Sequence, residues 1–258
     1  MAAVLAPLAV HIALIKRRLL IIAGTVLVAF ALTFAYAADL IAWLKRPFVD
    51  DLIFYGPTEA LFASIKVSFL AGVVLSLPVI FYQSWKFIQP ALLSRERRWA
   101  VPLFCLAAGL FALGIVFCNL VILPLVVQFF VSFGMDRDLT PQLSVGTYID
   151  FNVKFLVVFG FAFELPLVLT LLSRIGVVSP EILGQYRKHA VMAALILSAI
   201  ITPDATLFTM LLMAVPLMVL YELGVLGARW FGRRPPAGEP DMTVNHDLPV
   251  GPAGQRVR

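Results

Sequence analysis

Six long runs of apolar residues, separated by short charged segments, constrain the fold of this chain more than any other feature. They lie at about residues 19–38, 58–86, 100–133, 149–172, 190–201 and 207–230. Overall, 61% of the residues are hydrophobic and 14% are charged, whereas soluble domains average about half apolar and a quarter charged. A helix of about 20 apolar residues spans the hydrocarbon core of a bilayer. We therefore expect an all-α integral membrane protein with six transmembrane helices.

The division of the chain follows from these runs. We expect residues 1–18 to form a cytoplasmic N-terminal segment and residues 19–230 to form one membrane domain. Residues 231–258 are rich in Pro and Gly and lack an apolar period, which is typical of a disordered tail. No internal repeat is evident, so the inverted repeats of many transporters are not indicated.

The loops between the runs carry an uneven distribution of Lys and Arg. Basic residues on one side of the predicted membrane domain are Lys16, Arg17, Arg18, Lys86, Arg95, Arg97, Arg98, Arg174, Arg187, Lys188, Arg229, Arg233 and Arg234. The other, trans, side carries only Lys45, Arg46 and Arg137. By the positive-inside rule both termini are cytoplasmic, which requires an even number of spans. This orientation also accounts for the net charge of +5 better than nucleic-acid binding does.

The fifth run is unusually short. Residues 190–201 give 12 apolar residues, or about 18 Å of helix, against a hydrocarbon core of about 30 Å. The sixth run is interrupted by Pro216 and Glu222. We expect such a pair of short helices to thin the surrounding bilayer.

Four ionisable residues fall within the runs: Lys66, Lys154, Glu164 and Glu222. Each needs a partner, a wet cavity or an interfacial position, because a charge at membrane depth is costly. Both lysines are near the trans end of a span, where they can reach the interface, and Glu222 can lie at the cytoplasmic interface. Glu164 lies deep in the fourth run, which favours a functional role.

A cytoplasmic hairpin at residues 85–98 interleaves aromatic and charged side chains. Its arginines are explained by the positive-inside rule and its aromatics by an interfacial belt. Glu96 is either satisfied by its basic neighbours or receives a guanidinium group from outside in a bidentate pair.

Enzymatic functions find little support in the sequence. Its three histidines are His11, His189 and His246, and the paired spacings of a metal site, nucleophile-elbow glycines and phosphate-binding loops are missing. We therefore expect no metal and no cofactor. A membrane hydrolase with a Ser/His or Ser/Lys dyad is one alternative. A small-solute or ion transporter is the more serious one, but it needs several ionisable groups near the midplane, and only Glu164 fits.

Several motifs resemble those of TatC proteins, the twin-arginine translocase family, over about residues 11–230. They are LSLPVIFYQSWKFIQPAL at 75–92 with ERR at 96–98, FAFELP at 161–166, SPE at 179–181 with YRK at 186–188, TPD at 202–204 and YE at 221–222. The resemblance implies a concave, glove-like bundle of six helices in a bacterial-type cytoplasmic membrane. It also implies a non-enzymatic receptor for the twin-arginine signal peptides of folded cargo. Such a receptor assembles with TatA- and TatB-type single-span proteins, associates with itself and with lipid, and depends on the proton-motive force.

The resemblance also assigns roles to individual residues. Glu96, followed by Arg97, matches the loop carboxylate that receives the arginine pair, and Phe87 and Pro90 match the scaffold of that loop. By the same comparison, Glu164 matches the polar group inside the bundle. Pro47 matches the proline of the first trans loop, which the family uses for assembly, and Asp204 matches a residue of the last trans loop. The fifth and sixth helices correspond to the docking place of the single-span partners.

One departure from the family pattern concerns the N-terminal segment. Leu14 stands where the second signal-binding carboxylate is expected. With one of two carboxylates missing, the sequence predicts weaker or altered recognition of two arginines, or a specialised paralogue.

Overall fold

The computed structural model describes residues 2–45, 52–88, 100–135, 144–201 and 206–232. These residues are almost entirely helical, apart from an isolated bridge between Ile53 and Ser144. The helices in chain order are α1 (Ala2–Ala35), α2 (Ala37–Lys45), α3 (Glu59–Ile88), α4 (Ala100–Phe117), the π-helical segment Cys118–Ile122, α5 (Leu123–Met135), α6 (Val145–Arg174), α7 (Pro180–Gln185), α8 (Arg187–Ile201) and α9 (Leu207–Phe231). The expected all-α class is confirmed.

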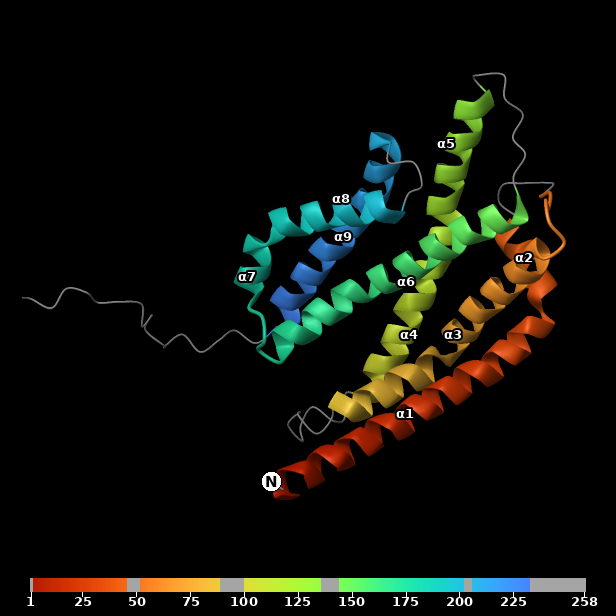
Figure 1. The fold of residues 1–258 in the computed structure, drawn as a ribbon. Coiled ribbons are helices and arrows are strands. Elements are labelled where there is room, and N and C mark those ends of the chain that lie inside the picture. The colour runs from red at the N-terminus through yellow and green to blue at the C-terminus, as the bar shows by residue number, and fades with distance from the viewer. Residues whose placement is uncertain (1, 46–51, 89–99, 136–143, 202–205, 233–258) are drawn as a thin grey trace, which may run out of the picture.

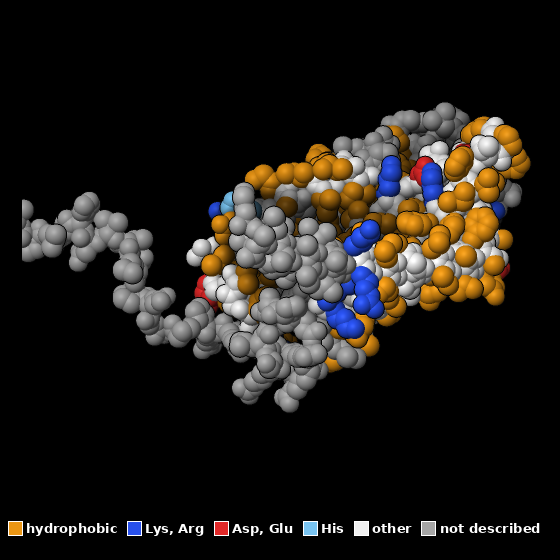
Figure 2. Space-filling view, turned by 60° about the horizontal axis from the view of Figure 1, so that its bottom comes forward, with side chains coloured by type: hydrophobic (Ala, Val, Ile, Leu, Met, Phe, Trp, Pro, Cys, Tyr) orange, Lys and Arg blue, Asp and Glu red, His pale blue; other side chains and the backbone are white. Residues whose placement is uncertain are grey.

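Helix α6 is the central element of the bundle. It packs against α3, α4 and α9, while α1 packs along α3 and α8 packs along α9 (Figure 1). Phe155 and Phe159 of α6 are fully buried in the main apolar core. The outer faces remain apolar, since residues such as Leu27 and Leu211 expose 68% and 52% of their surface. Hydrophobic side chains dominate the face in Figure 2, as expected for a protein surrounded by lipid.

Five helices in the described part of the chain are long and apolar enough to cross a membrane. They contain the spans Ile15–Ala35, Glu59–Ser84, Pro102–Gly134, Val145–Arg174 and Leu207–Phe231. The expected short fifth helix is present as α8, which has 15 residues. Whether α8 makes a sixth span remains a prediction.

Helix α1 differs from its expected bounds. It begins at Ala2 and passes without interruption through the basic cluster at residues 16–18, where the sequence suggested a separate segment followed by a helix from residue 19. Ala and Leu are strong helix formers and dominate the N-terminal stretch. The chain breaks instead at Tyr36, after which α2 continues to Lys45.

Pro124 lies within the third apolar run, at residues 100–133. The π-helical segment Cys118–Ile122 lies directly before it, and the Leu123 N–H donates to the Cys118 carbonyl. A proline in a helix lacks an N–H and its ring meets the carbonyl four residues earlier. The wider π turn relieves that clash, so α4 and α5 are joined by a local widening of the helix.

Close approach between α4 and α6 depends on two glycines. A Cβ on Gly114 would lie 2.5 Å from the Phe159 carbonyl oxygen, and one on Gly160 would lie 2.6 Å from the Phe111 ring. Small residues let membrane helices pack with their backbones close together. This contact determines the surroundings of Glu164, one turn after Gly160.

Candidate functional site

Glu164 is the clearest candidate for a functional residue within the described bundle. It is 8% exposed, and its carboxylate lies close to the backbone of Phe111 in α4. Its Oε1 atom has no hydrogen-bond partner among the described residues. The surroundings are aromatic, with Phe111 against Phe161 and Phe117 against Phe163. A carboxylate in such a place costs stability. The functional role of Glu164 remains a prediction.

The other ionisable residues of the runs lie in less demanding positions. The Lys66 ammonium pairs with Asp150, which joins α3 to α6, and both side chains are partly exposed. Arg187 donates to the Glu222 carboxylate at 2.8 Å and joins α8 to α9. Lys154 is exposed. Lys66 and Glu222 therefore have partners for their charges, whereas an interfacial position for Lys154 remains a prediction.

The arrangement gives a transporter little support. The ion pairs Lys66–Asp150 and Arg187–Glu222 link different pairs of helices and do not include Glu164. A transport site would bring several ionisable groups together near the midplane. In addition, no three His, Cys, Asp or Glu residues of the described ranges form a group that could hold a metal.

Most of the residues assigned by resemblance lie outside the described ranges: Pro47, Pro90, Glu96, Arg97 and Asp204. Phe87 is in the last turn of α3, which ends at Ile88, and α4 begins at Ala100. The loop that contains Glu96 is therefore bounded by α3 and α4, the first of which packs on α1. The roles of these residues remain predictions.

A second carboxylate, that of Glu59, lies at the N-terminal end of α3. The sequence interpretation missed its role. Glu59 Oε1 accepts from the Ser144 hydroxyl and from the Gly146 N–H at 3.1 Å, and Oε2 accepts from the Tyr55 N–H at 2.8 Å. A carboxylate at the first turn of a helix is favourable, and Glu59 serves both α3 and the N-terminus of α6. The sequence interpretation assigned no role to Glu59.

Two buried amides were also missed. Asn119, in the π-helical segment, and Asn152, in α6, are 1% and 0% exposed. Asn119 Oδ1 and both side-chain polar atoms of Asn152 have no hydrogen-bond partner within the described part of the chain. Uncharged polar residues inside a run of apolar residues give a weak signal in sequence, because many of them pack against neighbouring helices.

These features define a polytopic helical membrane protein with one buried, unpaired carboxylate oxygen and no evident catalytic group in the described ranges. The model of the family "Sec-independent protein translocase protein (TatC)" matches residues 10–216. Among relatives, the TatC protein of Aquifex aeolicus is 40% identical over 225 residues, which cover 85% of this chain and 93% of the relative. That of Desulforapulum autotrophicum is 36% identical over 248 residues, covering 94% of this chain and 91% of the relative.

Solved structures agree with the sequence relatives. The crystal structure described as "Twin Arginine Translocase Receptor- TatC" has a TM-score of 0.76 and 38% identity, and the match covers 86% of this chain and 99% of that chain. A second crystal structure of such a receptor, in DDM, has the same TM-score at 40% identity, with 84% and 98% covered. This chain belongs to the TatC family of Sec-independent protein translocase proteins.

Proposed function

We propose that this chain is the receptor subunit of a twin-arginine translocase, which binds signal peptides at its cytoplasmic face and moves folded proteins across the cytoplasmic membrane. The observation that carries the proposal is the likeness to solved TatC receptor structures along nearly their whole length. It assembles with TatA- and TatB-type single-span proteins and with further copies of itself, and the proton-motive force drives transport. No nucleotide or metal chemistry enters this role.

The proposed recognition site is the loop between α3 and α4. Glu96 accepts a guanidinium of the arginine pair in a charge-assisted, bidentate contact, and Arg97 lies next to it in the loop. Phe87 and Pro90 shape the start of that loop. Helices α3 and α4 both pack on α6 as well as on each other, so the two ends of the loop are held by the bundle.

The other proposed contacts lie away from this loop. The antiparallel pair α8 and α9 provides the surface on which single-span partners dock, and the Arg187–Glu222 pair joins the two helices. Pro47 and Asp204 take part in assembly on the trans side. Both termini are cytoplasmic, as the Lys and Arg asymmetry indicates.

The experiment is to measure binding of a twin-arginine peptide to the full chain in nanodiscs. One charge-assisted contact is worth about 1.5–3 kcal/mol, so Glu96→Ala should weaken binding by about one to two decades. Glu181→Ala is the matched control, because Glu181 is an exposed carboxylate of α7, and it should bind as the parent does. Unchanged affinity of Glu96→Ala would contradict the receptor assignment.

Leu14 offers a gain-of-function test of the same site. Leu14→Glu supplies a second carboxylate and should tighten binding of the twin-arginine peptide, with a smaller effect on a twin-lysine peptide, because only guanidinium pairs bidentately. The gain should shrink as salt is added. Equal gains for both peptides would show general charge attraction instead of arginine recognition.

A further inference from the structure

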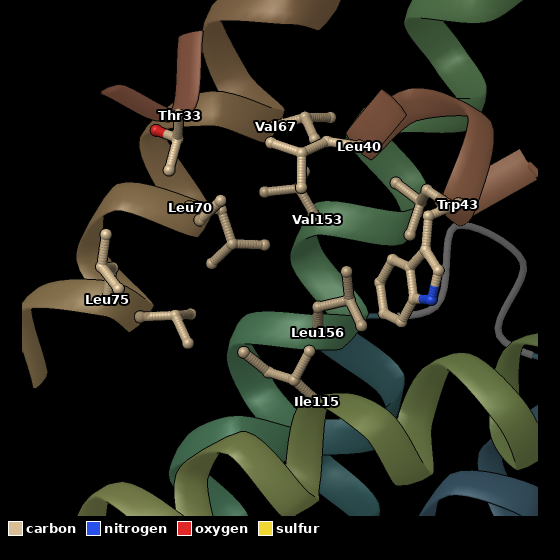
Figure 3. Close-up of a pocket in the computed structure, with 12 residues that line it drawn as sticks. Thr33, Leu40, Trp43, Val67, Leu70, Leu75, Ile115, Val153 and Leu156 are labelled. Carbon is tan, nitrogen blue, oxygen red and sulfur yellow. The ribbon is translucent and has the colours of Figure 1, made fainter. Parts of the chain in front are cut away.

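An apolar hollow opens between α2, α3, α4 and α6. Its volume is about 310 Å³, and its walls include Leu40 and Trp43 of α2, Leu70 of α3, Ile115 of α4 and Leu156 of α6 (Figure 3). Leu156 is 2% exposed, whereas Leu75 and Trp43 expose 60% and 40% of their surface. The hollow therefore has a deep wall and an open side.

The lining chemistry excludes ordered water as the occupant. Its one hydroxyl belongs to Thr33, which already donates to the Ser68 carbonyl at 2.7 Å. The remaining lining side chains are apolar or, for Trp43, mainly so. A buried water needs about two to four polar partners, so the hollow favours a hydrocarbon.

The shape of the hollow suits a hydrocarbon chain. Along α3, its lining extends from Val67 to Leu75, which is about 12 Å of helix. A long, thin chain fits these proportions.

The charges near the hollow fit a lipid headgroup. Lys66 precedes the lining residue Val67, and Lys154 follows the lining residue Val153. Lys66 forms an ion pair with Asp150. Lys154 is exposed, and neither ion pair described above includes Lys154. Trp43 lies at the open side, and tryptophan is enriched where lipid headgroups meet the apolar core.

We propose that the hollow is a binding site for one acyl chain of a glycerophospholipid, whose phosphate lies at Lys154 and Lys66. The acyl chain fills the space between α2, α3, α4 and α6. The lipid is therefore a structural component of this side of the bundle. The site is separate from the Glu96 loop, and its occupation does not depend on signal-peptide binding.

The test uses the full chain in nanodiscs that contain a phospholipid with a photoreactive diazirine near the end of one acyl chain. After irradiation, mass spectrometry locates the adducts. We expect adducts on the deep lining residues Leu156 and Ile115, and Ala71→Phe, which fills the hollow, should reduce them at least fivefold. Ala31→Phe is the matched control, because Ala31 is exposed on α1, and it should leave these adducts unchanged. Adducts on outward residues such as Leu27 should be the same in all proteins.

A second measurement identifies the occupant without filling the hollow. Leu75→p-benzoylphenylalanine places a photoreactive group at the open side, and the mass of the cross-linked product shows what it met. A phospholipid adduct supports the proposal. A peptide from a second copy or from another part of this chain would overturn it, as would diazirine labelling confined to outward residues or unaffected by Ala71→Phe.

Discussion

The contact between α4 and α6 at Gly114 gives a prediction whose size follows from the structure. In Gly114→Ala the new Cβ would lie 2.5 Å from the Phe159 carbonyl oxygen, below the 3.0 Å that Cβ atoms keep. The nearest atom is backbone, so α6 must shift as a whole. Overpacking of this kind lowers the free energy of unfolding by about 1–3 kcal/mol, and the better helix propensity of alanine offsets up to about 1 kcal/mol of this. We expect the free energy of unfolding to fall by about 1–2 kcal/mol.

The assay is thermal unfolding of the purified protein in detergent. A change of 1 kcal/mol corresponds to roughly 2–4 °C for a chain of this size, so Gly114→Ala should lower Tm by about 2–8 °C. Gly109→Ala, in the same helix, is the control because nothing lies within 4 Å of its added Cβ. It should leave Tm unchanged or raise it slightly. If the two variants have the same Tm, the close approach of α4 and α6 is not what requires glycine.

Three further predictions concern carboxylates and the short helix. Glu164→Leu should lower export of a twin-arginine reporter while the amount of membrane-inserted protein stays the same, because removing a buried carboxylate relieves a cost; normal export would leave Glu164 without a function. Glu59→Ala should lower Tm more than Asp39→Ala, since Glu59 accepts three hydrogen bonds that tie α3 to the start of α6; equal effects would contradict the tie. Four leucines inserted after Ala194 should reduce export but not insertion, and full export would remove the role of a short helix.

Sequence reasoning located the helices well because lipid imposes a simple requirement. Backbone N–H and C=O groups within the lipid must form hydrogen bonds inside the protein, because no water is present there. Apolar runs bounded by charges therefore become helices. The runs at 58–86 and 207–230 correspond closely to α3 (Glu59–Ile88) and α9 (Leu207–Phe231). The Thr206 side chain accepts from the Thr209 N–H at the start of α9, which is a local capping signal.

Features that depend on distant partners were not accessible in this way. The Glu59 carboxylate meets Ser144 and Gly146, which are 85 and 87 residues away in sequence. A proline such as Pro124 disturbs a helix, but the sequence does not show that a π-helical segment accommodates it. Glu164 was found because its charge stands out among apolar residues, whereas Asn119 and Asn152 carry no charge and were overlooked. Glu96 was assigned by resemblance, since its loop offers a carboxylate among basic residues and no other local signal.

The length of α8 connects the fold to the proposed transport of folded proteins. Its 15 residues give about 22 Å of helix, roughly 8 Å less than the hydrocarbon core of an ordinary bilayer. Tilting would not relieve this mismatch, because a tilted short helix reaches even less far across the bilayer. If α8 is the sixth span, we expect the bilayer to become thinner at this side of the bundle, at a cost of fractions of a kcal/mol for each Å. A receptor that gathers single-span partners on α8 and α9 would therefore assemble them where the lipid barrier is already weakened.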